Sequence, residues 1–330
     1  MNLKNAIDDL LELSFVGSFT RVGPAVRRRL FGWDAPTAGA LDGRTALVTG
    51  PTSGLGRAVA EQLAGLGARV ILVGRNRQRL ESVRDALIRA HGEDRFPIVV
   101  ADMSSLVSVR AAVSDVLASE RQLDVVVDNA GAIFAERTES TDGFESTFAV
   151  LVMGPFVLLG GLLPLLQETP GSRVIAITSG GMYTQALDLN DLQSRAPGYS
   201  GSRAYARAKR AQTSLIREWA RRLSSAGPTF HTMHPGWADT PGLADSLPAF
   251  YRFMKPLLRS PAEGADSVTW LASTPDPSPL NGQLILDRRS RPFDRIARTR
   301  LSAADRRRLW DQVVALSGGQ DPAPEARTSG

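Results

Sequence analysis

The sequence predicts an α/β fold in which a doubly wound, parallel sheet carries helices on both faces. Three observations lead to this prediction. From Leu41 onward, short apolar runs of strand length alternate with helical patterns. Strands joined through helices of roughly ten or more residues run parallel, because a hairpin cannot make the crossover. A glycine-rich turn follows the first apolar run directly, as it does where a buried strand leads into a helix.

The expected elements follow one another in a regular order. Strands are predicted at residues 45–49, 69–73, 98–101, 125–127, 173–178, 229–231 and 283–286. Helices are predicted at residues 54–66 and 78–90, and a third helix starts after Asp102 and Ser104, two residue types that cap helix N-termini. Helical patterns separate most of the later strands as well, so the alternation covers the length of one domain.

We predict a single Rossmann-type domain at residues 41–290, between an N-terminal extension and a C-terminal tail. In the extension, residues 1–40, apolar side chains recur at helical spacing from Leu3 to Leu11. They predict a short amphipathic helix, either packed on the body of the protein or in peripheral contact with a membrane. Residues 291–330 are expected to form a basic helix and then, from Gly318, a disordered tail rich in Gly, Pro, Ala and Ser.

One segment, Phe148 to Leu166, carries no charge over 19 residues. It is long enough to span a bilayer, but it contains Gly and Pro and is explained equally well by a buried helix of an α/β protein. A run this apolar exceeds what a half-exposed helix needs. We therefore predict that it also contributes to the interface of a homo-oligomer.

The composition excludes several classes of function. With no cysteine, the chain has no disulfide, iron–sulfur cluster or thiolate zinc site, and a reducing compartment such as the cytoplasm is expected. The net charge of +5 is concentrated between residues 287 and 308, where nine Arg face three Asp, so no general nucleic-acid-binding surface is indicated. Acidic residues interrupt the first apolar run, which argues against a secretory signal. His231 and His234 point to opposite faces of a strand, and no metal site is expected.

The turn after the first strand reads Gly50-Pro51-Thr52-Ser53-Gly54-Leu55-Gly56. A strand that leads into a helix through such a turn directs backbone N–H groups and the positive helix end at a phosphate. The glycines lack a Cβ, so a pyrophosphate can approach the backbone closely. No Gly-Lys-Ser/Thr follows, which excludes a nucleoside-triphosphate loop. The turn therefore predicts a dinucleotide site.

The end of the second predicted strand bears on the type of dinucleotide. NAD-binding proteins place an acidic side chain there for the ribose hydroxyls. This chain has Gly74 in that place and Arg75 next to it. Gly74 exerts no repulsion on a 2′-phosphate, and the Arg75 guanidinium is a suitable donor for it. The sequence favours NADP(H) over NAD(H).

Tyr205 and Lys209 stand four residues apart in a helical pattern and so share one face. The chain has only four Tyr and three Lys, which makes a chance pairing uncommon. A free tyrosine, with a pKa of about 10, is a poor acid–base catalyst at neutral pH, and a neighbouring ammonium favours its phenolate. Ser179 ends the fifth predicted strand, and Asn129-Ala130-Gly131 follows the fourth.

In this order, the glycine turn, Asn-Ala-Gly, the serine and Tyr-x-x-x-Lys resemble the short-chain dehydrogenase/reductase superfamily over residues 41–290. The resemblance implies a catalytic domain in which Ser179 holds the substrate oxygen, Tyr205 exchanges a proton with it, and Lys209 binds the nicotinamide ribose and lowers the pKa of Tyr205. It implies that the following residues border the cofactor: Gly50, Thr52, Ser53, Gly54, Leu55, Gly56, Arg75, Asp102, Met103, Asn129, Ala130, Gly131, Tyr205, Lys209, Pro235, Gly236 and Thr240.

Two residues depart from the family pattern. Asp128 stands where the family usually has an Asn, and Leu151 stands in place of the Asn of its catalytic tetrad. Pro155 has no N–H for the Leu151 carbonyl, and this predicts a free carbonyl near Lys209. The predicted function is hydride transfer between NADP(H) and a small carbonyl or alcohol substrate. Aromatic residues after the sixth strand suggest a lipophilic substrate. The alternative is a non-catalytic NADP(H)-binding sensor or scaffold, which Leu151 motivates.

Overall fold

The computed structural model describes residues 3–223 and 227–325 of the chain and contains one eight-stranded sheet in the order β3-β2-β1-β4-β5-β6-β7-β8. All neighbouring pairs are parallel except β7 and β8. The strands are β1 (Thr45–Thr49), β2 (Arg69–Gly74), β3 (Ile98–Val100), β4 (Val125–Asp128), β5 (Arg173–Ile177), β6 (Thr229–Met233), β7 (Leu284–Leu286) and β8 (Arg289–Arg291). The predicted doubly wound α/β fold is confirmed, and its switch point lies between β1 and β4.

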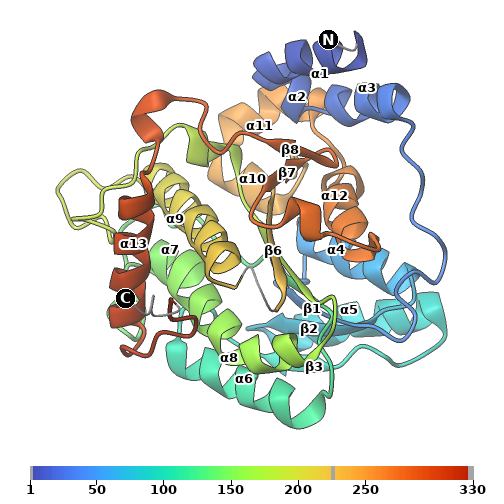
Figure 1. The fold of residues 1–330 in the computed structure, drawn as a ribbon, viewed down its shortest axis with the longest axis horizontal. Helices are drawn as coiled ribbons and strands as arrows, with labels where there is room; N and C mark the ends of the chain where they lie inside the picture. The colour runs from blue at the N-terminus through green and yellow to red at the C-terminus, as the bar shows by residue number, and fades with distance from the viewer. Residues whose placement is uncertain (1–2, 224–226, 326–330) are drawn as a thin grey trace, which may run out of the picture.

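Helices cover both faces of the sheet (Figure 1). On one face lie α4 (Gly54–Gly65), α5 (Arg77–His91) and α12 (Pro261–Ser273), and on the other lie α6 (Leu106–Ser119), α8 (Gly154–Glu168) and α9 (Gly201–Arg222). Alternate strand residues point into the two cores, for example Val48 and Val127 into one and Leu47 and Val126 into the other. Both faces are therefore apolar, which explains why the strands appear in the sequence as continuous apolar runs.

Further helical elements lie between and beyond these strands and helices. They are α1 (Leu3–Leu13), α2 (Phe15–Phe19), α3 (Val22–Phe31), α7 (Ser146–Phe148), the π-helix η1 (Ala149–Met153), η2 (Gly180–Tyr183), α10 (Pro241–Ser246), α11 (Pro248–Met254), η3 (Lys255–Leu257), η4 (Ser278–Leu280), η5 (Ala297–Thr299) and α13 (Ala303–Leu316). Helix α6 is capped by Ser105, while the Asp102 carboxylate instead accepts from the N–H and hydroxyl of Ser104. The predicted start of this helix was thus slightly early.

The N-terminal extension forms three helices rather than one, and they pack against β8 and the segment after α11 (Figure 1). A fully buried Arg27 on α3 binds Asp8 and Glu12 of α1 and reaches Asp287 at the end of β7, with N–O distances of 2.6–2.7 Å. Apolar spacing alone could not reveal this arrangement, because buried ion pairs join the helices to the domain.

Strand β8 was not predicted. It pairs with β7 through a two-residue turn in which Asp287 and Arg288 both have a positive φ, of 53° and 58°. Such turns match the twist of a β-hairpin. The strand itself is Arg-Ser-Arg, and its Arg291 is held by the buried Asp8 at 2.9 Å. Without an apolar pattern, nothing in the local sequence marks it as a strand.

The C-terminal helix α13 lies over α8 and α9 (Figure 1). Trp310 packs edge-on against Phe156 of α8 and Trp219 of α9, with ring centres 5.0 and 4.9 Å apart. The following residues continue along the same surface, where Asp321 bonds Arg222 and Ala323 is buried. The prediction of disorder from Gly318 is therefore wrong for residues 318–325, since composition carries no information on such distant partners. Residues 326–330 lie outside the described part.

Helices α7, η1 and α8 run on from one another over Ser146–Glu168, and this segment is long and apolar enough to cross a membrane. However, 72% of its most apolar window is buried inside the protein. That burial is typical of the core helix of an α/β protein, the interpretation that its Gly and Pro content favoured. Within it, Gly154 N donates to the Ala149 carbonyl, five residues back, which defines a π-bulge.

Candidate active site

The glycine turn joins β1 to the N-terminus of α4. Ser53 is the N-cap of this helix, and among the described residues its side chain makes no capping hydrogen bond. The first backbone N–H groups of α4 are therefore available to an anion. A Cβ on Gly56 would lie 2.2 Å from the Gly50 carbonyl oxygen, so only glycine permits this tight turn. The turn thus offers N–H groups and a close backbone approach to a pyrophosphate, and its role as the cofactor site stays a prediction.

Asn129 at the end of β4 holds the turn in place. Its Nδ2 donates to the carbonyl oxygens of Thr49 and Gly50 at 2.8 and 3.1 Å. The Thr49 hydroxyl in turn accepts from the backbone N–H groups of Asn129 and Ala130. These bonds cross the switch point, so Asn129 and Ala130 position the turn besides bordering the site. Gly131 follows them and is exposed.

Gly74 and Arg75 lie at the end of β2, where a ribose would meet the sheet edge. Arg75 is exposed, and no hydrogen bond or ion pair engages its guanidinium among the described residues. Asp102 and Met103 follow β3 along the same edge, Asp102 half-buried and Met103 buried. Arg75 is thus free to bind a phosphate, and Asp102 keeps one carboxylate oxygen beyond the one that bonds Ser104.

Ser179 and Tyr205 form the centre of the site. Ser179 follows β5, and Tyr205 stands on the second turn of α9. Burial raises the pKa of the Tyr205 phenol, and a hydrogen bond with the Ser179 side chain lowers it. The Ser179 hydroxyl also accepts from the Gly181 N–H at 3.4 Å. The structure thus brings together the serine and tyrosine predicted to be catalytic.

Lys209 lies one helical turn beyond Tyr205 and is buried. Its Nζ donates to the Ile177 carbonyl at 2.7 Å and to Gln212 Oε1 at 3.0 Å. Burial lowers the pKa of Lys209 to about 8, while the negative charge of Asp128 raises it. In this arrangement Ser179 lowers the pKa of Tyr205, and the effect of Lys209 that the resemblance implies stays a prediction.

The loop after β6 closes the site on the side of the glycine turn. A Cβ on Gly54 would lie 3.1 Å from Thr240 Cγ2, so this loop and the turn are in contact. Gly236 has a φ of 72°, and its N–H donates to His234 Nδ1 at 2.8 Å. Thr240 caps α10 through its hydroxyl. Together with Pro235, these residues border the same space as the glycine turn.

Comparison with known proteins places this geometry in a family. The family model described as short chain dehydrogenase matches residues 44–249. The chain belongs to the short-chain dehydrogenase family. The motifs agree with this assignment. The matched region contains the glycine turn, the Asn-Ala-Gly segment, Ser179, Tyr205 and Lys209.

Several relatives of this short-chain dehydrogenase align over most of their length. Dehydrogenase/reductase SDR family member 12 of Bos taurus is 38% identical and covers 84% of this chain and 87% of its own. Retinol dehydrogenase 14 of Mus musculus is 34% identical, covering 90% and 91%, and polyprenol dehydrogenase of the same species is 32% identical, covering 96% and 97%. The segments 179–182, 190–194 and 233–242 predict a likeness to family member 12 in particular, and the match confirms it.

A solved structure from Beutenbergia cavernae with bound NADP shares the fold of this short-chain dehydrogenase. It is 25% identical, with a TM-score of 0.63, and covers 76% of this chain and 97% of its own. The chain is thus a member of an oxidoreductase family whose members bind a nicotinamide cofactor.

Sequence reasoning missed the part that the extension plays in this short-chain dehydrogenase. The Phe19 carbonyl accepts from the Trp237 N–H at 2.7 Å, in the loop that carries Gly236. The Phe19 ring stacks on His234 with ring centres 4.4 Å apart. A Cβ on Gly180, next to Ser179, would lie 3.1 Å from this ring. The Phe19 ring therefore packs behind Ser179, and a Phe in a short apolar helix gives no signal of this contact.

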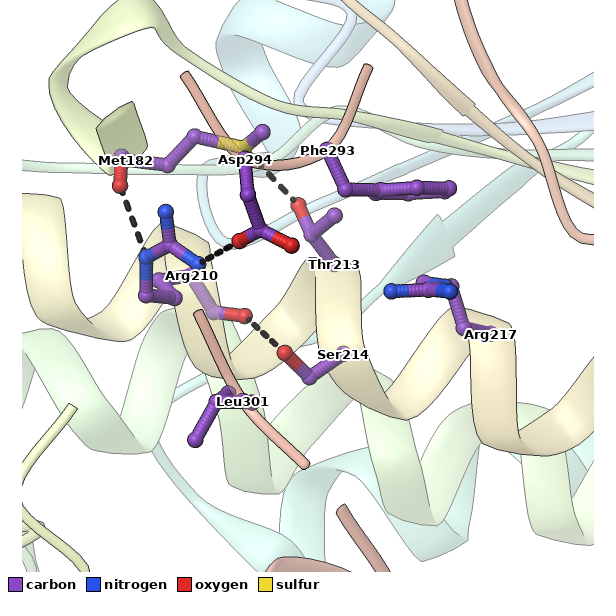
Figure 2. Close-up of a pocket in the computed structure, with 8 residues that line it drawn as sticks. All are labelled: Met182, Arg210, Thr213, Ser214, Arg217, Phe293, Asp294 and Leu301. Atoms are coloured by element: carbon purple, nitrogen blue, oxygen red, sulfur yellow. Dashed lines mark hydrogen bonds and ion pairs between the residues drawn. The ribbon is translucent and has the colours of Figure 1, made fainter. Parts of the chain in front are cut away.

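Arg210, the neighbour of Lys209, was missed as well (Figure 2). Its guanidinium binds the Met182 carbonyl at 2.8 Å, Asp294 at 2.9 Å and the Thr299 hydroxyl at 2.8 Å. These bonds tie α9 to η2, the turn that directly follows Ser179, and to the segment before α13. These three bonds fix Ser179 relative to Tyr205. The sequence indicates this role of Arg210 only by placing an Arg on the apolar side of a helix.

Metal binding finds no support in the described part of the chain. His231 bonds the Leu280 carbonyl and the Thr229 hydroxyl, and His234 packs under Phe19. Burial lowers the pKa of His231 to about 4 and that of His234 to about 3, so both are neutral at physiological pH. No group of three or more His, Asp or Glu side chains is arranged for a metal ion within the described residues.

Proposed function

We propose that this chain is an NADP(H)-dependent carbonyl reductase or alcohol dehydrogenase whose catalytic residues are Ser179, Tyr205 and Lys209. The observation that carries the proposal is the hydrogen bond between Ser179 and Tyr205, with Lys209 one helical turn further on. The groups proposed to hold the cofactor are the glycine turn from Gly50 to Gly56, Arg75, Asp102, Met103, Asn129 to Gly131, Tyr205, Lys209, Pro235, Gly236 and Thr240.

Each of the three residues has a separate role in carbonyl reduction. When bound, the nicotinamide cofactor supplies the hydride that adds to the carbonyl carbon. Ser179 donates a hydrogen bond to the carbonyl oxygen and holds it beside Tyr205. Tyr205 gives its phenolic proton to that oxygen, which becomes the hydroxyl of the alcohol product. In the reverse direction the Tyr205 phenolate takes the proton back. The lysine ammonium, buried behind the tyrosine, favours the phenolate through its charge.

Turnover separates this proposal from the alternative of an NADP(H)-binding sensor or scaffold, which Leu151 motivates. We expect NADPH to be consumed in the presence of lipophilic aldehydes or ketones, and NADP to be reduced in the presence of the matching alcohols. A screen at fixed protein concentration, monitored at the absorbance of NADPH, makes the measurement. Tight NADPH binding without turnover on any member of a broad panel would favour the sensor.

The choice of NADP(H) rests on Gly74 and on the free Arg75. We expect Gly74→Asp to move the ratio of the NAD and NADP dissociation constants at least about tenfold toward NAD, because a carboxylate there repels the 2′-phosphate. A Cβ at this position would lie 3.3 Å from Leu80 Cδ2, so the Leu80 side chain would have to shift by a few tenths of an ångström. Arg75→Gln is the companion variant and should weaken NADP binding while leaving NAD binding unchanged. Tighter binding of NAD than of NADP by the unmodified protein contradicts the choice.

We further propose a lipophilic substrate and contact of the protein with a membrane surface from the cytoplasmic side. Retinol and polyprenol appear in the names of two relatives. The extension and the segment after β6 expose large apolar side chains, among them Leu10 at 70% and Phe253 at 83%. A hydrogen bond from the Arg21 N–H to the Leu257 carbonyl joins the two regions. Exposed Arg252 and Lys255 nearby suit anionic lipids.

Vesicle sedimentation tests this contact. We expect the protein to sediment with vesicles that contain phosphatidylglycerol, and the Leu10→Ser, Phe253→Ser double variant to bind about tenfold or more weakly. Val107→Ser is the matched control, since Val107 is 71% exposed on α6, away from this surface. Equal binding of the double variant and the control would contradict the proposal.

Homo-oligomer formation stays a prediction, but the structure argues against an interface at the uncharged segment Phe148–Leu166. Pairing through the uncharged segment Phe148–Leu166 would meet α13, because Trp310 of α13 packs on Phe156 of α8 and on Trp219 of the neighbouring α9. We therefore propose that any second copy binds the exposed apolar surface of the extension instead. Light scattering without lipid, on the unmodified protein and on the Leu10→Ser, Phe253→Ser double variant, distinguishes a dimer from a monomer.

A further inference from the structure

A polar chain lies behind Lys209 and has no part in the catalytic roles above. Lys209 Nζ donates to Gln212 Oε1 at 3.0 Å, and Gln212 Nε2 donates to Asp128 Oδ2 at 2.5 Å. Lys209 and Gln212 lie on α9, and Asp128 lies at the end of β4. All three side chains are almost fully buried. A single amide thus joins a buried ammonium to a buried carboxylate.

The carboxylate is the unusual member of this chain. Burial raises the pKa of Asp128 to about 6, while the charge of Lys209 and the hydrogen bond from Gln212 lower it. Its second oxygen, Oδ1, has no hydrogen-bond partner among the described residues. A buried carboxylate with one unsatisfied oxygen is costly, so its presence calls for a physical reason. Tyr205 is the other titratable group close to this pair. Among the described residues, Asp128 is the one acidic group whose charge raises the pKa of Lys209.

The surroundings explain why the lysine needs such a partner. Leu151 replaces the Asn of the family tetrad, and its side chain offers no polar atom. Pro155, four residues on, has no N–H. Leu151, Pro155, Asp128 and Gln212 line one small cavity. The direct partners of the lysine are Ile177 and Gln212, and not the Leu151 carbonyl.

We propose that Asp128, acting through Gln212, is a positioning residue that holds the Lys209 side chain and its positive charge, in place of the missing tetrad amide. The proposal rests on the function proposed above only in assigning Lys209 to catalysis. Asp128 fixes the direction of the ammonium through the amide bridge and keeps it protonated by its charge. The two departures from the family pattern are then linked: Leu151 removes a polar group near Lys209, and Asp128 supplies another.

The three lysines of the chain make a direct test possible. In protein labelled with ¹³C-lysine, three Cε signals are expected, and Lys4 and Lys255 are exposed whereas Lys209 is buried. The Lys209 signal should titrate at its lowered pKa of about 8. In Asp128→Asn the pKa of Lys209 should fall by about one unit or more, because the charge that raised it is gone. The control is Asp124→Asn, which changes a buried Asp directly before the same strand and should leave the Lys209 signal unchanged.

Activity adds a second readout. In Asp128→Asn, kcat should fall at alkaline pH. The midpoint of this alkaline decrease should move to lower pH by as much as the pKa of Lys209 does. A Lys209 titration that is the same in Asp128→Asn and in the unmodified protein overturns the proposal. Should Asp128→Asn fail to fold, Gln212→Met, which breaks the bridge and keeps both charges, must alter the Lys209 signal or the proposal fails. Absence of turnover on every substrate would affect only the proposed function, since the lysine titration needs none.

Discussion

Tyr205→Phe is expected to lower kcat for carbonyl reduction by about 10²–10⁴-fold, with little change in the dissociation constant of NADPH. The substitution removes one oxygen, which is the proton donor in the proposed reaction and the partner of Ser179. The phenyl ring still fills the same space, so the fold and the glycine turn are unaffected. Single-turnover kinetics with a carbonyl substrate found in the screen, together with NADPH titration by fluorescence, make the measurement.

Tyr199→Phe is the matched control. It removes a phenolic oxygen six residues earlier, where Tyr199 donates to Glu145 at 3.0 Å, away from Ser179. Its kcat should stay close to that of the unmodified protein. Equal activity of the two variants, or an unchanged kcat in folded Tyr205→Phe with hydride transfer limiting the rate, would rule out the assigned role.

The pH dependence provides an independent check of the same residue. Because burial raises the pKa of Tyr205, the phenol is protonated at neutral pH and ready for reduction. Reduction should therefore be fastest below this pKa and slow as the pH rises through it, whereas alcohol oxidation should gain speed over the same range. The hydrogen bond with Ser179 lowers the pKa, so Ser179→Ala should move the rise of the oxidation rate to higher pH.

The sequence predicted best what depends on local pattern. The strands buried on both faces, such as β1 and β5, appear as continuous apolar runs, and the glycine turn marks the connection after β1 by residue type alone. Tyr205 and Lys209 share one face because helical spacing fixes it. These features follow from backbone geometry and burial, which neighbouring residues in the chain determine.

What the sequence could not predict depends on partners far apart in the chain. Strand β8 is polar and exists because its Arg291 binds Asp8, more than 280 residues earlier. Phe19 contacts the loop of Gly236, and an ion pair between Arg27 and Asp287 joins the extension to the same part of the domain. The tail at residues 318–325 is ordered against Arg222, although its composition is typical of disorder. Charged side chains stabilise all three features. Ion pairs between residues far apart in the chain leave no periodic pattern in the sequence.

The same pairs connect the extension to the site. Asp287 accepts from Arg27 of α3 at 2.6 Å and from both terminal nitrogens of Arg259 at 2.6 and 3.0 Å. Arg259 also donates to the carbonyl oxygens of Ser18 and Phe19. A Cβ on Gly236 would lie 2.3 Å from Arg259 Nε, so this side chain packs directly on the loop proposed to hold the cofactor. One carboxylate therefore supports both the extension and the loop.

Asp287→Asn is expected to destabilise the protein by about 3 kcal/mol, because it leaves two fully buried guanidinium groups short of one negative charge. Asparagine keeps the shape of the side chain and tolerates the positive φ of 53° at this position, so the loss reports on charge rather than on backbone strain. Urea unfolding gives the free energy. NADPH affinity should fall as well, because Arg259 would no longer hold the loop of Gly236 in place.

Asp266→Asn is the control for Asp287→Asn, since Asp266 also binds an arginine through two nitrogens, at 2.7 and 2.8 Å, but is 20% exposed. Its loss should cost about 1 kcal/mol or less and leave NADPH affinity unchanged. Limited proteolysis adds a local readout, since Asp287→Asn should speed cleavage within residues 3–31 and Asp266→Asn should not. Similar unfolding midpoints for the two variants, with equal resistance of the extension to protease, would show that Asp287 does not secure the extension to the active site.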